Sequence, residues 1–553
     1  MQPKFLLIGL DGGTPSLITK WLNELPTFQR LITDGWRGEI ESTVPATTIP
    51  AWNSIYSGKN PGKLGIYDFL ITPHYRPKGL EPANYTIAPT KYLWDLLSAS
   101  SITSEFINVP IMFPPPKLQG VAVSGGIFVP IHRGSLITYP ESVKEELDLV
   151  TGGYEASPFM DLSLEGKESI YLSKALLNLR KQGDAVNYLI SRYKWDFFSY
   201  VFSITDTIQH YFWHQSDSEH TWHRRPKSAI WSDSIKKVYM EVDRQLGRIL
   251  NAVPKDVNVM IVSDHGGGPL TGHFFVNRWL RDEGYLEANV NGREFLTGKL
   301  LIRIKNLSVD RLPRVSERLA PLLPLRLTSR LFGRGLMRDS YSKALAAIDW
   351  PRTVAYGLGS QGAIYINLLG REPHGIVGAS GYDSLRNAII SKLRSLRSPV
   401  NGEPLSVKVW TSEDLYNGDY LRFAPDINFV IQDNQFVQKV DVTPGAVWGE
   451  PDVSGGHSSR GFFCVAGPDF KKSQTDLLVT VCDILPTVLH ELGLPIPSDL
   501  DGRVLAELFE ENSSASRRGP IYRDATRTDF HQSQLTEEDE EEIKKRLESL
   551  GYM

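Results

Sequence analysis

Short apolar runs that end at an aspartate alternate with helix-period segments along the chain. The runs are "KFLLIGLD" (4–11), "WDFFSYVFSIT" (195–205), which Asp206 follows, and "VNVMIVSD" (257–264). Continuous apolar runs of this length are typical of buried strands, and strand–helix alternation predicts a parallel sheet with helices on both faces. We therefore expect a doubly wound, mostly parallel α/β fold.

The aspartates Asp11, Asp206 and Asp264 follow the predicted strands, and ligands in such sheets bind beyond the carboxyl ends of strands. A single aspartate in this place is commonly a helix N-cap, but three of them favour a shared site. His210 lies four residues after Asp206, so on a helix both side chains would point to one side, although an exposed Asp–His pair is an equally simple interpretation. His265 directly follows Asp264 and precedes a glycine run that permits close backbone approach.

Two further residues complete a candidate metal site. His457 lies in "SGGHSSRG", where a lone histidine would more often be a surface residue. Thr48 lies in "TTIPAW", and Pro50 predicts a helix start that places Thr48 at an N-terminus suited to a phosphate. The simpler interpretation of Thr48 is an N-cap hydroxyl, a role for which Thr47 competes. Three Asp, three His and one Thr together form a ligand set for two metals in which the threonine oxygen is also the nucleophile.

Carboxylate and imidazole ligands without thiolate suit Zn²⁺, Mn²⁺ or Fe²⁺. Two such ions can clamp a phosphoryl group, and metal coordination is the physical route to a reactive threonine alkoxide. We therefore expect two divalent metal ions as cofactors, with Zn²⁺ as the first choice.

Composition narrows the class of protein. In 553 residues, 41% hydrophobic and 22% charged content is that of an ordinary globular chain, and a net charge of -4 argues against generic nucleic-acid binding. Only two cysteines, Cys464 and Cys482, argue against a disulfide framework and fit a reducing compartment. The first residues lack a signal-peptide pattern, and no stretch approaches the ~18 apolar residues of a membrane span. These features predict a cytoplasmic protein.

An ordered series of motifs resembles the alkaline phosphatase superfamily, and within it the type I phosphodiesterase and nucleotide pyrophosphatase group. The series comprises "LIGLDG", a Thr-x-Pro segment followed by "SGKNPGKLGIYDF", Asp-x-x-x-His, "SDHG", a late "GGH" and "DILPTVLHELGLPIPSDLDGRVL", from about residue 4 to 505. The resemblance implies a covalent phospho-threonine or phosphodiester-threonine intermediate that water hydrolyses. It also implies two metal sites, one held by Asp11, Thr48, Asp264 and His265, the other by Asp206, His210 and His457.

The resemblance has departures. Nucleotide pyrophosphatases carry an asparagine where this chain has Phe69, which argues against nucleotide pyrophosphatase activity. The Cys/Ser-x-Pro-x-Arg motif of sulfatases is missing at the nucleophile. Phosphoglycerate mutases typically use serine and place the third histidine soon after the Asp-His pair, whereas here His457 follows His265 by 192 residues. The chain is more similar to a subgroup of predicted phosphohydrolases or phosphomutases.

The surroundings of Thr48 predict the substrate class. We expect Lys59 and Lys63 to be solvated, which leaves an aromatic, cation-poor wall, and such a wall favours a phosphodiester over a monoester. Arg460, three residues after His457, could reverse this preference by turning onto the phosphate. The predicted substrate contacts are Trp52, Asp68, Phe69 and Arg460.

The sequence thus predicts a metal-dependent hydrolase of small phosphoric esters, with no nucleic-acid partner. A phosphomutase or a phosphomonoesterase is the alternative within the superfamily. An alternative of another class is a metal-stabilised binding protein without catalysis, against which the intact Thr48 and ligand set argue.

The predicted domain organisation has two parts. A catalytic domain covers 1–505, with cap insertions near 110–170 and 280–345, and 506–553 is an extension with an acidic surface helix. The basic stretch 299–338 could attract an anionic lipid or a membrane surface. A cap with inward-facing leucines and solvated arginines is the simpler interpretation of that stretch.

Overall fold

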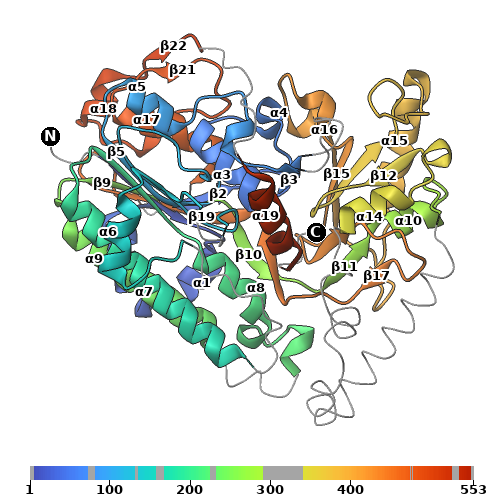
Figure 1. Cartoon of the computed structure of the whole chain (residues 1–553), viewed down its shortest axis with the longest axis horizontal. Helices are drawn as coiled ribbons and strands as arrows, with labels where there is room; N and C mark the ends of the chain where they lie inside the picture. Colours follow the sequence, from blue (N-terminus) through green and yellow to red (C-terminus); the bar gives the residue numbers. More distant parts are fainter. Residues whose placement is uncertain are drawn as a thin grey trace.

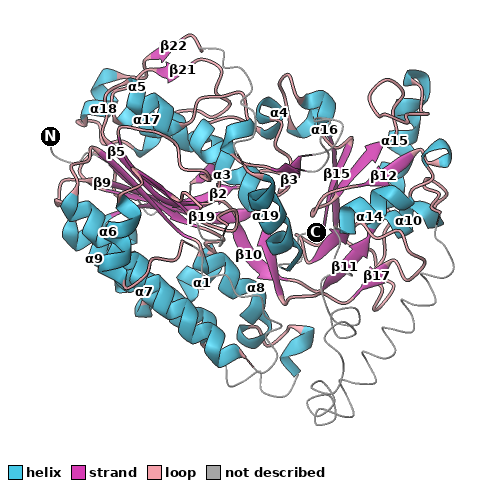
Figure 2. Ribbon diagram, viewed as in Figure 1, coloured by secondary structure: helices cyan, strands magenta, loops and turns pink. Residues whose placement is uncertain are grey.

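A nine-stranded sheet with helices on both faces dominates the computed structural model (Figures 1 and 2). Its central strands β9, β1 and β8 are parallel neighbours, as are β8, β5 and β6, whereas β19 runs antiparallel to β2 and β9. This sheet confirms the predicted doubly wound, mostly parallel α/β fold. In their order across the sheet the strands are β20 (Leu478–Thr480), β2 (Gly35–Glu41), β19 (Arg460–Ala466), β9 (Asn258–Ser263), β1 (Phe5–Leu10), β8 (Phe197–Phe202), β5 (Ser104–Val109), β6 (Gly120–Ser124) and β7 (Thr138–Tyr139).

The structure describes most of the chain. The described residues are 5–71, 81–130, 135–156, 167–224, 232–289, 340–473, 475, 477–525 and 535–549. The predicted basic stretch 299–338 lies outside them. Among the described helices, none is long and apolar enough to cross a membrane.

Successive residues of β1 pack into two separate cores. Phe5 and Leu7 belong to one buried cluster, and Leu6, Ile8 and Leu10 belong to the other. Because side chains alternate across a strand, a sheet covered on both faces requires a continuous apolar run, which is what the sequence shows. The first core includes α3 (Thr48–Ser57), α5 (Leu93–Ala99) and α17 (Ile484–Glu491); the second includes α1 (Pro15–Lys20), α2 (Pro26–Asp34), α6 (Val143–Thr151), α7 (Glu168–Arg192), α8 (Ile204–Ser216) and α9 (Ser234–Ala252).

A second, seven-stranded sheet is formed by residues between Gly272 and Gly449 (Figure 1). Its strands are β12 (Ala355–Gly357), β13 (Ala363–Ile366), β15 (Ile427–Ile431), β16 (Phe436–Lys439), β11 (Gly272–Phe275) and β17 (Trp448–Gly449), with β14 (Val407–Thr411) paired to β15. Helices that accompany it are α10 (Val276–Asp282), α14 (Ser340–Ala347) and α15 (Ala379–Arg394). The predicted insertion at 280–345 falls within this part of the chain, and the division into domains stays a prediction.

A two-stranded ribbon connects the two sheets. It consists of β10 (Gly266–Pro269), which follows β9, and β18 (Gly455–Ser458), which precedes β19. The strands pair antiparallel, with Gly267 opposite His457. The ribbon therefore pairs the end of "SDHG" with the late "GGH", although the residues of the whole second sheet lie between these two motifs in the sequence.

The last helix, α19 (Glu537–Ser549), packs back onto the chain rather than standing clear of it. Ile543 and Leu547 are buried in the first core, and Arg546 donates to the carbonyl oxygens of Ile127 (3.1 Å) and Val129 (2.6 Å). Glu537, Glu538 and Glu541 are exposed on this helix, whereas Asp539 is buried on its anchored side. Further short elements are α4 (Pro61–Leu64), α16 (Ser412–Leu415), α18 (Ser514–Arg518), β3 (Leu70–Ile71), β4 (Glu81–Pro82), β21 (Ile496–Pro497) and β22 (Tyr522–Arg523).

Candidate metal centre

Three aspartates converge at the carboxyl edge of the central sheet. Asp11 directly follows β1 and Asp264 directly follows β9, while Asp206 lies in the first turn of α8, just beyond β8. Because β9, β1 and β8 are neighbours in the sheet, their carboxyl ends bring the three side chains to one place. This is the edge at which open α/β sheets bind ligands.

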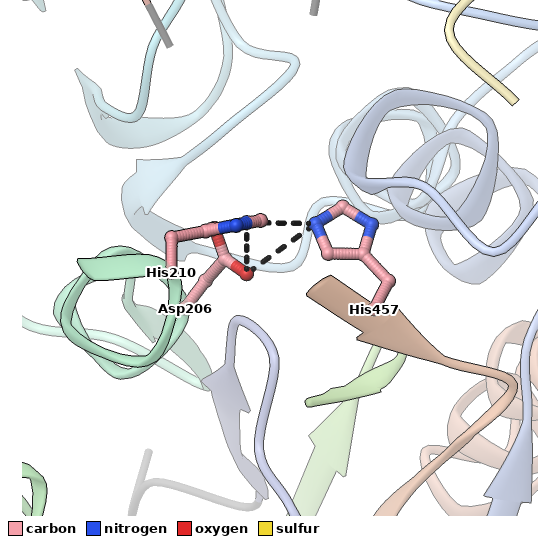
Figure 3. A group of neighbouring side chains, drawn as sticks. All are labelled: Asp206, His210 and His457. Carbon is pink, nitrogen blue, oxygen red and sulfur yellow. Dashed lines mark hydrogen bonds and ion pairs between the residues drawn. The ribbon is translucent and has the colours of Figure 1, made fainter. Parts of the chain in front are cut away.

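One group of ligand candidates consists of Asp206, His210 and His457 (Figure 3). His210 Nε2 lies 3.2 Å from Asp206 Oδ1 and 3.0 Å from His457 Nε2, which itself lies 3.5 Å from Asp206 Oδ1. The Nδ1 atoms of His210 and His457 each lie 2.8 Å from a carbonyl oxygen, of Gly455 and Ala46 respectively. A carbonyl oxygen only accepts, so each Nδ1 carries a proton, and the Nε2 atom of each ring faces the shared centre. Backbone carbonyls commonly orient metal-binding histidines in this way.

The ribbon explains how His457 reaches this group. Its β18 strand pairs with β10, which begins one residue after His265. The rings of His265 and His457 consequently stack, with centroids 3.8 Å apart. Pairing of the two strands thus brings His457 beside an Asp-His pair that is remote in sequence.

A second group consists of Asp11, Asp264 and His265, with Thr48 beside it. His265 Nε2 lies 3.2 Å from Asp264 Oδ2, 3.8 Å from Asp11 Oδ1 and 3.4 Å from Thr48 Oγ1. The Nδ1 atom of the same ring lies 3.0 Å from the carbonyl oxygen of Gly266 and donates to it. The two groups are divided as the motif resemblance implied.

The charges of the second group are poorly compensated by protein atoms. Burial raises the pKa of Asp264 to about 6, and burial together with the nearby charge of Asp264 raises the pKa of Asp11 well above its usual range. Asp11 Oδ1 and Asp264 Oδ2 are buried and have no hydrogen-bond partner among the described residues. Ionised buried carboxylates need a compensating cation.

The pKa values of the first group, Asp206, His210 and His457, are shifted in a different way. Burial raises the pKa of Asp206, but the charge and hydrogen bond of His210, together with the charges of His457 and His265, outweigh it and hold that pKa well below the usual range. Burial, reinforced by the neighbouring His265, lowers the pKa of His457 well below its usual value. An ionised carboxylate beside a neutral imidazole is the protonation state that binds metal.

The donor chemistry of both groups fits divalent metal ions. Each group offers carboxylate and imidazole atoms within 4.8 Å of one another. Thiolates do not contribute, since Cys464 lies inside β19, where burial raises its pKa to about 12. Carboxylate with imidazole is the ligand chemistry of Zn²⁺, Mn²⁺ and Fe²⁺.

The start of α3 distinguishes between two adjacent hydroxyls. Thr48 is the first residue of the helix and Thr47 is its N-cap residue, which makes no side-chain capping bond with a described residue. Thr48 Oγ1 faces His265, whereas Thr47 Oγ1 is buried without a hydrogen-bond partner in the described part of the chain. Thr48 is therefore the hydroxyl that lies against the second group, at the N-terminal helix position that Pro50 predicted.

The four predicted substrate contacts lie in different surroundings. Trp52 is fully buried and stacks on Tyr56, and its indole touches the position where Gly9 would carry a Cβ. Phe69 is 1% exposed and stacks on Phe128 with ring centroids 6.4 Å apart. The predicted contacts of these two rings with substrate stay predictions.

Asp68 links the segment between α4 and β3 to the part of the chain that forms the second sheet. Its carboxylate accepts hydrogen bonds from the Ser360 amide (2.5 Å) and hydroxyl (2.7 Å), and burial raises its pKa. Asp68 and Phe69 line a cavity of about 30 Å³ with Pro45, which lies two residues before Thr47. A cavity of this volume holds about one water molecule.

Arg460 lies outside the two groups. It forms an ion pair with Glu39 (3.3 Å), and its side chain is 47% exposed. It lines a groove of about 580 Å³ between α1, the ribbon and the second sheet, and the described residues that line this groove include none of the seven predicted ligands.

The prediction that Lys59 and Lys63 are solvated was wrong. Lys59 Nζ forms an ion pair with Asp499 (2.5 Å), and Lys63 Nζ forms one with Asp501 (2.7 Å), with side-chain exposures of 13% and 25% for the two lysines. Both partners belong to the "PSDLDG" segment near residue 500.

Sequence reasoning also missed Gln209 and Thr14, which bind the ligand-bearing segments together; their only signal was that Gln209 stands inside the Asp-x-x-x-His motif.

A doubly wound sheet with two carboxylate–imidazole groups at its carboxyl edge, beside a threonine at a helix start, defines a metal-dependent hydrolase of the alkaline phosphatase superfamily. Residues 5–459 match the type I phosphodiesterase / nucleotide pyrophosphatase family, and the chain belongs to this family. It is therefore a phosphoric ester hydrolase. A comparison with curated proteins found no match.

Proposed function

We propose that this chain hydrolyses small phosphodiesters with Thr48 as its nucleophile. The observation that carries the proposal is the position of Thr48 Oγ1, which lies 3.4 Å from His265 Nε2 at the first residue of α3. A hydroxyl in this place adjoins a buried cluster of carboxylates and imidazoles, where a phosphate can meet the hydroxyl and the metal ligands together.

The residues would hold two divalent metal ions, with Zn²⁺ favoured by three imidazole ligands. Such ions would lower the pKa of the Thr48 hydroxyl and neutralise the charge that develops on the phosphate. The ligands of one ion would be Asp206, His210 and His457, and those of the other Asp11, Thr48, Asp264 and His265.

The groups of the chain itself account for the remaining steps. Thr48 Oγ1 forms a bond to phosphorus while the bond from phosphorus to the leaving alcohol breaks. The amides of Thr48 and Ile49, in the first turn of α3, have no carbonyl of an earlier turn to bind and can donate to a phosphate oxygen. Water then breaks the Thr48–phosphorus bond, which releases the phosphomonoester product and restores the hydroxyl.

The cations around the site support a diester as the substrate. A monoester carries an extra negative charge that a lysine or arginine usually neutralises. Lys59 and Lys63 are held in ion pairs, and Arg460 is paired with Glu39 in a groove of its own. These pairs leave the phosphate charge to be met by the metal ions and the helix start.

The test compares bis-p-nitrophenyl phosphate with p-nitrophenyl phosphate. We expect a higher kcat/KM for the diester, and rapid-mixing experiments should show a burst of nitrophenol close to one equivalent when water attack is slower than the first step. Arg460→Ala should leave the preference unchanged, as should the control Arg503→Ala, which removes another exposed, ion-paired arginine. A preference for the monoester that disappears only in Arg460→Ala would contradict the proposal and favour a phosphatase or mutase.

A further inference from the structure

We infer that Gln209 is a positioning residue that fixes the two candidate metal groups relative to each other. It lies on α8 between Asp206 and His210, is 2% exposed, and belongs to neither group. Its side chain reaches the turn after Asp11 on one side and the ribbon that carries His457 on the other.

Hydrogen bonds fix the amide of Gln209 in one orientation. Its Nε2 donates to the carbonyl oxygens of Gly12 (2.7 Å) and Thr205 (2.6 Å), and its Oε1 accepts from Thr14 Oγ1 (2.6 Å). A flipped amide would place Oε1 against two carbonyl oxygens, which cannot donate. Gln209 therefore ties the turn after Asp11 to α8.

Thr14 extends this connection to the ribbon. Its Oγ1 accepts a hydrogen bond from the Gly267 amide (2.7 Å), and Gly267 is the residue that pairs with His457. The backbone amide of Thr14 donates to Tyr239 Oη (3.1 Å), which holds the turn against α9. A continuous path of hydrogen bonds thus runs from the ribbon through Thr14 and Gln209 to α8.

The glycines of the ribbon provide independent support. A Cβ on Gly267 would lie 2.3 Å from Gln209 Oε1, and a Cβ on Gly455 would lie 2.2 Å from the Gln209 carbonyl oxygen. A Cβ on Gly455 would displace the ribbon or the helix, because it meets backbone, and a Cβ on Gly267 would displace the side-chain amide of Gln209 from its position. Glycine at both positions therefore lets the ribbon lie directly on Gln209, so that the carbonyl of Gly455 reaches His210 Nδ1.

The consequence is geometric. One metal group takes two ligands from α8 and one from the ribbon, while the other takes Asp11 from the turn that Gln209 holds. Two metals act on one phosphate only at a fixed separation of a few ångströms, and small misplacements of reacting groups are costly. The hydrogen bonds of the Gln209 side chain go to Thr14, Gly12 and Thr205 and not to a candidate ligand side chain, so its role is to set this separation.

The inference rests on the proposed metal centre, so the experiment distinguishes failure of the metal centre from failure of the positioning role of Gln209. Zn²⁺ binding to metal-depleted protein is measured by calorimetry, and kcat and KM are measured with bis-p-nitrophenyl phosphate. Wild-type protein that binds no Zn²⁺ would refute the metal centre itself. With wild-type binding established, Gln209→Met, which keeps the side-chain length but removes the hydrogen bonds, should weaken Zn²⁺ affinity roughly 10- to 100-fold. It should also lower kcat more than it raises KM.

Gln215→Met is the matched control, because Gln215 is a buried glutamine further along the same helix. This variant should retain wild-type Zn²⁺ affinity and kcat. Equal losses in both variants, or Zn²⁺ affinity and kcat within about twofold of wild type in folded Gln209→Met, would overturn the inference.

If Gln209→Met does not fold, two variants of Thr14 test the inference instead. Thr14→Val removes the hydroxyl that joins Gln209 to Gly267, and Thr14→Ser keeps it. Zn²⁺ affinity should fall in Thr14→Val and recover in Thr14→Ser. Equal affinities in these two variants would overturn the positioning role.

Discussion

Replacing Thr48 with alanine should separate a catalytic hydroxyl from a structural one. The contact of Thr48 Oγ1 with His265 Nε2 is long, at 3.4 Å, and the N-cap of the helix is Thr47. Loss of one long hydrogen bond should cost about 1 kcal/mol or less of unfolding free energy. At ~2.1 cal/mol/K per residue, unfolding of 553 residues has an entropy of about 1.2 kcal/mol/K, so the melting temperature should fall by only about 1 °C.

The effect on rate should be far larger. If Thr48 attacks phosphorus, Thr48→Ala should lower kcat on bis-p-nitrophenyl phosphate by a factor on the order of 10⁴ to 10⁶. Since each tenfold change in rate is about 1.4 kcal/mol, the smaller factor already corresponds to a barrier increase of about 5 to 6 kcal/mol. A change of this size against a change of about 1 kcal/mol in stability would assign the hydroxyl to the chemical step.

Two variants complete the test, which combines steady-state kinetics, thermal melts and metal analysis. Thr48→Ser keeps the attacking oxygen and should keep measurable activity. Thr47→Ala removes a buried hydroxyl that has no hydrogen-bond partner among the described residues, so activity should stay within a few-fold of wild type. An inactive Thr47→Ala beside an active Thr48→Ala would show that the wrong hydroxyl has been assigned.

Three further predictions concern metal, packing and pH. Purified protein should hold close to two divalent transition metals per chain, and full turnover after exhaustive EDTA treatment would end the metal proposal. Trp52→Phe should lower the melting temperature and leave KM unchanged, because Trp52 is fully buried against Gly9; a raised KM at an unchanged melting temperature would restore it as a substrate contact. Burial, assisted by Asp469, raises the pKa of Glu491 to about 8, so the folded chain should lose stability as pH rises from the unfolded value of ~4.3 to about 8. The melting temperature of Glu491→Gln should therefore rise relative to that of wild type as pH rises from about 5 to 9. A difference in melting temperature that does not depend on pH would contradict this explanation.

The central strands and the aspartates beyond them were predictable because their causes are local. β1, β8 and β9 are buried on both faces, so each is a continuous apolar run that can be recognised without its neighbours. The spacing of Asp206 and His210 was equally local, since one helical turn places both side chains on the same side. The location of these residues at one edge of the sheet could therefore be predicted from the sequence.

The features that sequence reasoning missed depend on pairing between distant segments. The partners of Lys59 and Lys63 lie more than four hundred residues further along the chain, so the surrounding "SGKNPGK" segment carried no sign of them. Gln209 is fixed by Thr14 and by Gly12 from another strand end, contacts that become visible only when β1 and β8 are known to be neighbours. An isolated buried glutamine offers no periodic signal.

The ribbon also explains how candidate metal ligands that are far apart in the sequence come together. Everything from Gly272 to Gly449 is inserted between its two strands, yet the strand that carries His457 is positioned by pairing with β10 and by the close approach of Gly455 to Gln209, neither of which involves the second sheet. The second sheet instead meets the segment that leads into Thr48. Tyr416 donates a hydrogen bond to the carbonyl oxygen of Val44, and Ser360 binds Asp68. The candidate metal groups are thus built on the central sheet, and the inserted part of the chain contacts the segments on either side of α3, which begins at Thr48.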